Sequence, residues 1–184
     1  NVLELGCGTG SNINALIHYN MNITGIDISK ESIRICKKKY KLNKQDEFLN
    51  LDMLEINKIS KKFDLIIDIF SSYNLNSEEN EKLLELIHKK LKNNGIFFCY
   101  TPSKNSTSWK KEKDKFDEST LKSFKRKISP YFGHEGYFRF SSLTEIKSKL
   151  KKNNFKIEYN EIVSRTYNNT KEYFEFIVIE AKKK

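Results

Sequence analysis

The stretch Val2-Leu3-Glu4-Leu5-Gly6-Cys7-Gly8-Thr9-Gly10 decides how this sequence folds. Its first four residues predict a short buried strand, and the glycines at alternate positions predict a tight turn. Glycine lacks a Cβ atom, so such a turn lets the backbone approach a ligand closely. The periodicity of Thr9 to Tyr19 predicts a helix, whose N-terminus offers free N–H groups and the positive end of the helix dipole. Strand, turn and helix together predict a cofactor site.

The spacing of the glycines narrows the choice of cofactor. A dinucleotide fingerprint needs Gly-x-Gly-x-x-Gly or Ala, whereas position 11 here is Ser11. A phosphate-binding loop of the Gly-Lys-Ser/Thr type is absent. The turn is therefore glycine-rich without matching either nucleotide motif in full.

Strands and helices alternate over the first hundred residues, which predicts a parallel sheet with helices on both faces. After residue 101 the pattern changes: residues 102–141 are first lysine-rich and then aromatic, and we expect a substrate-binding insertion there. A helix over Ser142 to Lys152 and two closely joined strands, Phe155 to Thr166 and Tyr173 to Ala181, end the chain. No linker or repeat interrupts it, so residues 1–184 form a single domain. The other expected strands are Ile23 to Ile28, Phe48 to Leu51, Phe63 to Ile69 and Ile96 to Tyr100, with helices starting near Ser29 and Ser77 and the second ending at Asn93-Asn94-Gly95.

The segment Glu4 to Gly10 resembles motif I of the class I, Rossmann-like methyltransferases that use S-adenosylmethionine. The resemblance implies an α/β three-layer sandwich with a mostly parallel seven-stranded sheet of order 3-2-1-4-5-7-6, its strand 7 antiparallel. It also implies an enzyme that binds S-adenosylmethionine and releases S-adenosylhomocysteine. Members of the family usually carry helices before the first strand that cover the site. Here that strand begins at Asn1 or Val2, so we expect these lid helices to be lacking.

The resemblance assigns cofactor contacts to the strand ends. Asp27 lies 17 residues after Gly10, where an acid accepts hydrogen bonds from ribose hydroxyls; the alternative is a carboxylate that only caps a helix. Asp52 would accept from the adenine amino group, or be an ordinary loop residue. The predicted cofactor contacts are Glu4, Gly6, Cys7, Gly8, Gly10, Asp27, Ile28, Asp52, Met53 and Asp68, with Glu4 orienting the methionine end and Ile28 packing on adenine.

Aromatic residues and one histidine are the candidates for the acceptor side. Phe70 and Tyr73 follow the fourth strand, beyond which cofactor and substrate usually meet in the family, while Tyr131 and Tyr137 flank a loop in the insertion. His134 lies in that loop between Gly133 and Gly136 and is the predicted general base, because histidine titrates near neutral pH. The alternative is ordinary packing for each of them. His18 and His88 sit late in predicted helices and are expected to be structural.

The amino-acid composition indicates which class of molecule the protein acts on. The net charge is +10, but only four of the 34 basic residues are arginine, and the lysines are spread through the chain. We therefore expect a small-molecule acceptor, with RNA or protein methylation through the lysines of Lys110 to Lys127 as the second hypothesis and a non-catalytic cofactor-binding module as the third. Three widely spaced cysteines indicate a reducing cytoplasm and no metal site, and no apolar run is long enough for a membrane.

Overall fold

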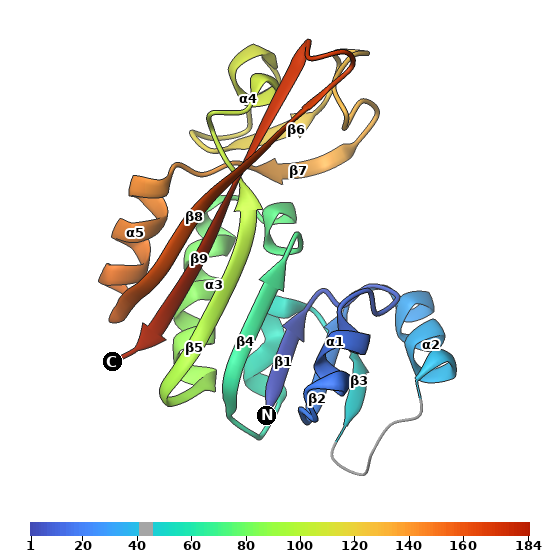
Figure 1. Ribbon diagram of the computed structural model, residues 1–184, viewed down its shortest axis with the longest axis vertical. Coiled ribbons are helices and arrows are strands. Elements are labelled where there is room, and N and C mark those ends of the chain that lie inside the picture. The colour runs from blue at the N-terminus through green and yellow to red at the C-terminus, as the bar shows by residue number, and fades with distance from the viewer. Residues whose placement is uncertain (41–45) are drawn as a thin grey trace.

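A seven-stranded sheet forms the middle layer of the molecule (Figure 1). The computed structural model describes residues 1–40 and 46–184. The sheet strands are β1 (Val2–Leu5), β2 (Ile23–Asp27), β3 (Glu47–Asn50), β4 (Phe63–Ile69), β5 (Leu91–Pro102), β8 (Phe155–Tyr167) and β9 (Glu172–Lys183). Their order is β3-β2-β1-β4-β5-β9-β8, and β9 runs antiparallel to both of its neighbours. The predicted strand order is therefore confirmed.

Helices cover the two faces of this sheet. On one face α1 (Ile13–His18) and α2 (Lys30–Lys39) contribute to a core around β1 and β2. On the other face α3 (Ser77–Lys90), α5 (Leu143–Lys152) and the 3-10 helix η1 (Met53–Lys58) pack on β1, β4, β5 and β9. All four residues of β1 are buried, as expected for a strand enclosed between two helical layers.

Polar caps fix where the helices begin. The Ser29 hydroxyl accepts a hydrogen bond from the Ser32 N–H at the start of α2, as the sequence predicts. The helix α3 starts at Ser77, as predicted, and Asn76 and Glu79 form a reciprocal capping box at this end. No helix in the described ranges is long and apolar enough to cross a membrane.

Two element boundaries differ from the sequence prediction. The helix after the glycine turn begins at Ile13, not Thr9, because positive φ values at Gly8 and Gly10 keep the intervening residues in turns. The helix α3 ends at Lys90, before the predicted stop at residues 93–95. Those residues instead form a bulge where the pairing of β4 with β5 shifts, and Asn94 adopts a left-handed φ of 61° there.

Residues 103–141 form a separate layer above the sheet, which we call the cap. It contains α4 (Thr107–Lys111), β6 (Thr120–Ser123) and β7 (Glu135–Arg139), and a bridge between Ser103 and Ser141 closes its base. Its apolar centre includes Phe124, Phe138 and Phe140, which pack against Phe174 of β9. The cap corresponds to the predicted insertion over residues 102–141.

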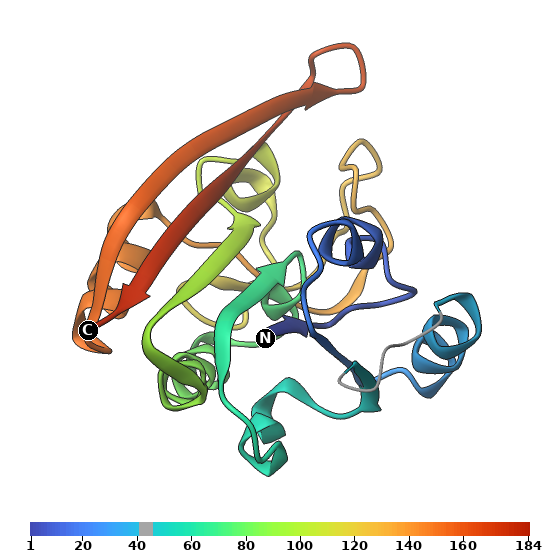
Figure 2. The ribbon, with the colours of Figure 1, turned by 60° about the horizontal axis from the view of Figure 1, so that its bottom comes forward.

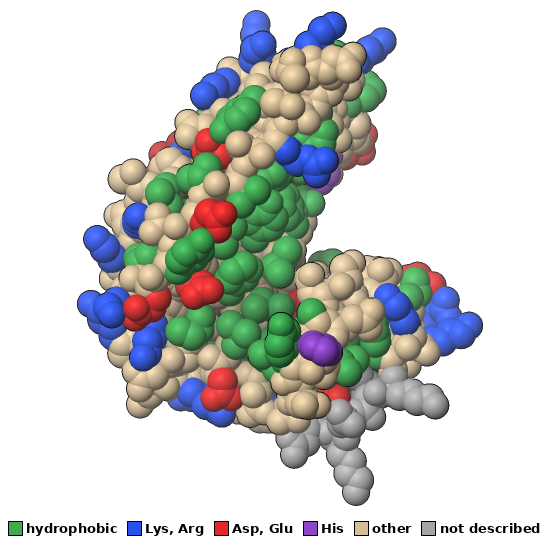
Figure 3. Space-filling model, in the orientation of Figure 1, with side chains coloured by type: hydrophobic (Ala, Val, Ile, Leu, Met, Phe, Trp, Pro, Cys, Tyr) green, Lys and Arg blue, Asp and Glu red, His purple; other side chains and the backbone are tan. Residues whose placement is uncertain are grey.

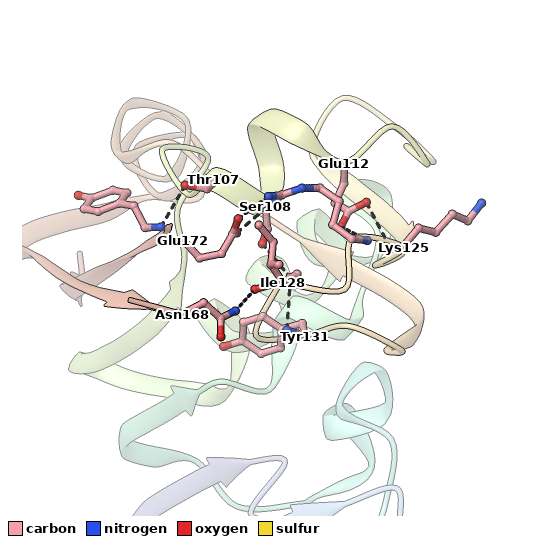
Figure 4. Close-up of polar contacts among 11 residues, drawn as sticks. Thr107, Ser108, Glu112, Lys125, Ile128, Tyr131, Asn168 and Glu172 are labelled. Atoms are coloured by element: carbon pink, nitrogen blue, oxygen red, sulfur yellow. Dashed lines mark hydrogen bonds and ion pairs between the residues drawn. The ribbon is translucent and has the colours of Figure 1, made fainter. Parts of the chain in front are cut away.

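The β8–β9 hairpin extends past the sheet and reaches the cap (Figures 1 and 2). Residues 168–170 at its tip all have positive φ values, between 49° and 67°. Figure 4 shows the polar contacts that fasten it: Glu172 pairs with Arg126, and the Asn168 amide donates to the Ile128 carbonyl. The Tyr173 N–H donates to the Thr107 hydroxyl at 3.1 Å. The hairpin therefore holds the cap over one end of the sheet.

Candidate functional site

The three glycines of the turn have different structural roles. All have positive φ, but a Cβ on Gly6 would come within 1.8 Å of the Ser71 hydroxyl oxygen. A Cβ on Gly10 would come within 2.5 Å of the Tyr40 ring, so Gly10 is required for packing against α2. A Cβ on Gly8 would meet nothing within 4 Å. Open space next to a left-handed glycine is the arrangement that lets a ligand touch the backbone.

Asp27 ends β2 beside this turn. One carboxylate oxygen accepts from the Gly8 N–H and the other from the Ser29 N–H, each at 2.8 Å. The Asn50 amide donates to the Asp27 and Ile28 carbonyls and holds the segment in place. Each carboxylate oxygen keeps an acceptor site after these bonds, so Asp27 has the capacity to receive two hydroxyl donors. Its helix-capping role and its ligand role are compatible.

Glu4 is a buried carboxylate below the glycine turn. Asn12 donates to its Oε1 at 2.8 Å, while Oε2 has no hydrogen-bond partner among the described residues. Burial raises the pKa of Glu4 to about 7, with the Asp27 charge adding to the effect and the Asn12 bond opposing it. An orphaned buried acceptor of this kind fits a cationic or N–H donor supplied by a ligand.

A pocket of about 350 Å³ opens where the carboxyl ends of β1, β2 and β4 meet. Figure 3 shows the surface hollowed beside the cap, with hydrophobic side chains along its wall. Five predicted cofactor contacts line the pocket together with Phe70: Gly6, Asp27, Ile28, Asp52 and Met53. Ligand pockets in α/β proteins form at this edge of the sheet, and the volume suits a nucleoside-sized molecule.

The wall formed by residues 51–53 and 71–75 supplies both predicted and unpredicted contacts. Asp52 accepts from the Leu54 N–H at 2.8 Å and caps η1, which turns Met53 toward the pocket. Leu51, Ser71, Asn74 and Leu75 also line it and were missed by the sequence analysis. Residues 71–75 form an irregular turn around the 3-10 helix η2 (Ser72–Asn74), which has no periodic signal to predict it.

Five predicted cofactor contacts are not part of the pocket lining: Glu4 and Gly8, which lie beside it in the glycine turn, and Cys7, Gly10 and Asp68. Cys7 is buried in the core beside Cys36, and Gly10 is closed off by Tyr40. Asp68 lies within β4, and its carboxylate is buried under the next turn. There it accepts from the Ser72 hydroxyl and from the Ser71 and Ser72 N–H groups. Asp68 thus shapes the wall of the pocket from behind.

The predicted acceptor residues divide into two groups. Phe70, Tyr73, Tyr131 and His134 belong to one network of ring contacts, in which Tyr73 lies 6.4 Å from His134 between ring centroids. Tyr137 points to the other face of β7 and packs against Phe116 at 4.5 Å. The His134 Nε2 atom lies 3.4 Å from the Tyr137 carbonyl oxygen. Of these residues Phe70 alone lines the pocket at the strand ends, and its φ of 54° is unusual for a residue other than glycine.

The geometry fits a nucleoside cofactor with a charged amino-acid end. The fit rests on the open space at Gly8, the acceptor capacity of Asp27 and the unpaired Oε2 of Glu4. Among the described residues, no group of three or more His, Cys, Asp or Glu side chains could hold a metal ion.

Comparisons with known proteins agree with this geometry. A family model described as a methyltransferase domain matches residues 2–95, about half of the chain. Over 108 residues the chain is 31% identical to the ubiquinone biosynthesis O-methyltransferase of Pelagibacter ubique, a stretch that is 59% of this chain and 44% of that protein. The chain thus spans less than half the length of the curated relatives it matches.

Solved methyltransferase structures share the fold. An S-adenosylmethionine-dependent methyltransferase from Methanosarcina mazei has a TM-score of 0.77 at 18% identity, covering 99% of this chain and 91% of that one. The magnesium protoporphyrin IX methyltransferase of Synechocystis, solved with bound S-adenosylmethionine, has a TM-score of 0.68 at 16% identity, covering 100% and 69%. At these sequence identities, the structural similarity shows a shared fold.

Proposed function

This chain belongs to the methyltransferase domain family, in the Rossmann-like class that uses S-adenosylmethionine, and from this premise we propose that it methylates a hydroxyl or amine of a small molecule. The observation that carries the proposal is the pocket at the strand ends, where Asp27 lines the wall next to the open backbone of Gly8. The name of the Pelagibacter relative supports a small-molecule acceptor.

The proposed cofactor contacts follow from the chemistry of each position. Asp27 accepts from the two ribose hydroxyls, and Asp52 accepts from the adenine amino group through the oxygen that does not cap η1. Ile28 is 75% exposed and covers the adenine face with apolar surface. Glu4 acts through its unpaired Oε2 on the cationic methionine end. When bound, S-adenosylmethionine supplies a methyl group on a positively charged sulfur.

The protein's own part in the reaction is to orient the acceptor and exclude water, because methyl transfer is an in-line displacement. An oxygen or neutral-amine nucleophile also loses a proton, and His134 is the proposed base. Its ring packs on Phe138 and lies near Tyr73, which places it in the same aromatic network as Phe70 at the pocket edge. A base at this position would receive the proton on the cap side of the pocket.

The experiment is methyl transfer from isotope-labelled S-adenosylmethionine to fractionated acceptor pools. We expect label in the small-molecule fraction, and we expect His134→Ala to lower kcat by 100-fold or more once the acceptor saturates. Label in RNA or protein alone would replace the proposal by the second hypothesis. Cofactor binding without transfer to any pool would favour a non-catalytic module. Unchanged kcat in His134→Ala would remove the base role and leave the cofactor assignment intact.

A further inference from the structure

An aromatic surface runs from the cofactor pocket along the β8–β9 hairpin. In the hairpin Val163 pairs with Phe176 and Arg165 pairs with Phe174. Tyr100 of β5 pairs with Val178 of the same strand β9. Residues directly opposite each other in antiparallel strands project to the same face, and alternate residues along a strand share it. Tyr100, Phe176, Phe174 and Arg165 therefore lie on one face of the sheet.

Phe70 joins this face to the cofactor pocket. Its ring centroid lies 4.9 Å from that of Tyr100 and 5.0 Å from that of Phe176, and the same side chain lines the pocket. A left-handed φ at a bulky residue is costly and is retained where the surroundings impose it. Here it turns the Phe70 ring away from the end of β4 and onto the aromatic face.

The surface is accessible and its far end is polar. Phe174 and Phe176 are buried, whereas Tyr100, Tyr131 and Tyr167 remain half-buried beside them. Burial raises the pKa of Tyr131, and the neighbouring phenols of Tyr167 and Tyr100 add to that shift. The Tyr131 ring lies 4.9 Å from that of Phe174 and the Tyr100 ring 5.3 Å from that of Phe176, so phenol rings border the two buried phenylalanines.

Arg165 gives this region a positive charge. Its guanidinium stacks over the Tyr167 ring at 4.8 Å, and no carboxylate pairs with it in the described part of the chain. Glu172, which pairs with Tyr167 across the hairpin and so shares its face, is fully buried in an ion pair with Arg126 (Figure 4). The guanidinium is thus an unneutralised donor at the end of an aromatic surface.

We propose that the acceptor is a planar aromatic molecule that carries an anionic group, with its ring on the face formed by Phe70 and Tyr100 and its anion at Arg165. This inference rests on the proposed function and names the substrate class of the same site. Phe70 contacts Phe176, which lies two residues after Phe174, the residue opposite Arg165; this is a distance of about 7 Å along the strand. Side chains and a substituted ring together span such a distance.

The test is ligand-observed NMR titration of the protein saturated with S-adenosylhomocysteine. The probes are 4-hydroxybenzoate, phenol, which lacks the anion, and 4-hydroxycyclohexanecarboxylate, which lacks the aromatic ring. We expect 4-hydroxybenzoate to bind at least about 10-fold more tightly than either, or about 1.4 kcal/mol. Equal affinity for 4-hydroxybenzoate and either comparison probe would overturn the inference, as would absence of binding.

Two variants test whether Arg165 binds the anionic group of the acceptor. Arg165→Gln should weaken 4-hydroxybenzoate about 10-fold and leave phenol unchanged, because only the charged contact is removed. Arg34→Gln removes one positive charge from α2 and should change neither. An Arg165→Gln variant that binds 4-hydroxybenzoate like the wild type would refute the anion site. Binding of S-adenosylhomocysteine in the same samples distinguishes failure of this inference from failure of the proposed function. If S-adenosylhomocysteine binds and 4-hydroxybenzoate does not, only this inference fails. If S-adenosylhomocysteine does not bind, the proposed function fails as well.

Discussion

Gly8 and Gly10 both have a left-handed backbone, but their surroundings differ: Gly8 faces open space and Gly10 faces the Tyr40 ring. A methyl group on Gly8 would project into open space, so Gly8→Ala should cost about 1 kcal/mol of stability through φ alone. In the proposed binding mode the same methyl group would occupy space that the cofactor needs. We therefore expect Gly8→Ala to weaken S-adenosylhomocysteine binding more than 10-fold, measured by calorimetry on the folded variant.

Gly10→Ala is the matched comparison. Its new methyl group would lie 2.5 Å from the Tyr40 ring, so overpacking should lower the free energy of unfolding by about 2 kcal/mol or more. Denaturant unfolding of both variants measures this difference. The two glycines would have the same role, contrary to this account, if Gly8→Ala lost as much stability as Gly10→Ala and bound cofactor normally.

Glu4 should give the protein a pH-dependent stability. Its folded pKa of about 7 lies above the unfolded value near 4.5, so the folded state favours the protonated carboxyl. The stabilisation is present below the unfolded pKa and is lost as pH rises through 7, a change on the order of 3 kcal/mol. Urea unfolding at about pH 5 and about pH 8 should show this loss in the wild type and not in Glu4→Gln. A Glu4→Gln variant with the same pH dependence would locate the titration elsewhere.

For single residues, the sequence predicted which positions carry an acid better than it predicted where the side chain points. Asp27 and Asp52 were predicted from the ends of apolar strands, and both lie at the pocket. Asp68 was also predicted from a strand end, but its carboxylate bonds to the backbone of residues 71–72. Which side of a turn receives a carboxylate depends on tertiary contacts that spacing alone does not encode.

One buried ion pair joins the β8–β9 hairpin to the cap. Glu172 is fully buried, and Arg126 is its ion-pair partner. Arg126→Met would leave a buried charge unpaired, so we expect a loss of about 3 kcal/mol in unfolding free energy. Amide hydrogen exchange should increase first in β6, β7 and the hairpin tip. Arg34→Met, which breaks an exposed pair with Glu31, is the control and should cost under about 1 kcal/mol.

Equal losses in the two variants would show that the Arg126 contact does not fasten the cap. The helix starts predicted near Ser29 and Ser142 illustrate what local sequence predicts well, since a hydroxyl three residues before a free N–H needs no distant partner. The predicted start of α1 was wrong because the left-handed backbones of Gly8 and Gly10 keep the chain in turns up to Asn12. The fold of the cap was not predictable because its aromatic residues pack on β9, far along the chain.

For the whole molecule, alternating strands and helices together with the resemblance at Glu4 to Gly10 were enough to predict the sheet order. The surface charge was harder to interpret. Several cap lysines are engaged locally: Lys115 stacks on Trp109 and Lys125 pairs with Asp114. These contacts favour a surface that is not reserved for a polyanion.

Salt dependence tests that interpretation. A singly charged small acceptor should lose affinity by no more than about 10-fold between low and physiological salt, measured by NMR titration. An RNA held by several lysines would lose about 1,000-fold or more over a similar range. A steep dependence for the true acceptor would support the lysine-rich surface as the binding site.

The most direct test of the central claim is calorimetric binding of S-adenosylhomocysteine to the wild-type chain, Asp27→Ala and Asp64→Ala. Asp64 is the control, because it pairs with Lys92 at the start of β4, away from the pocket. We predict wild-type binding near micromolar, about −8 kcal/mol, weakened about 100-fold by Asp27→Ala and unchanged by Asp64→Ala. A folded wild-type chain that does not bind, or an Asp27→Ala variant that binds equally well, would contradict the account.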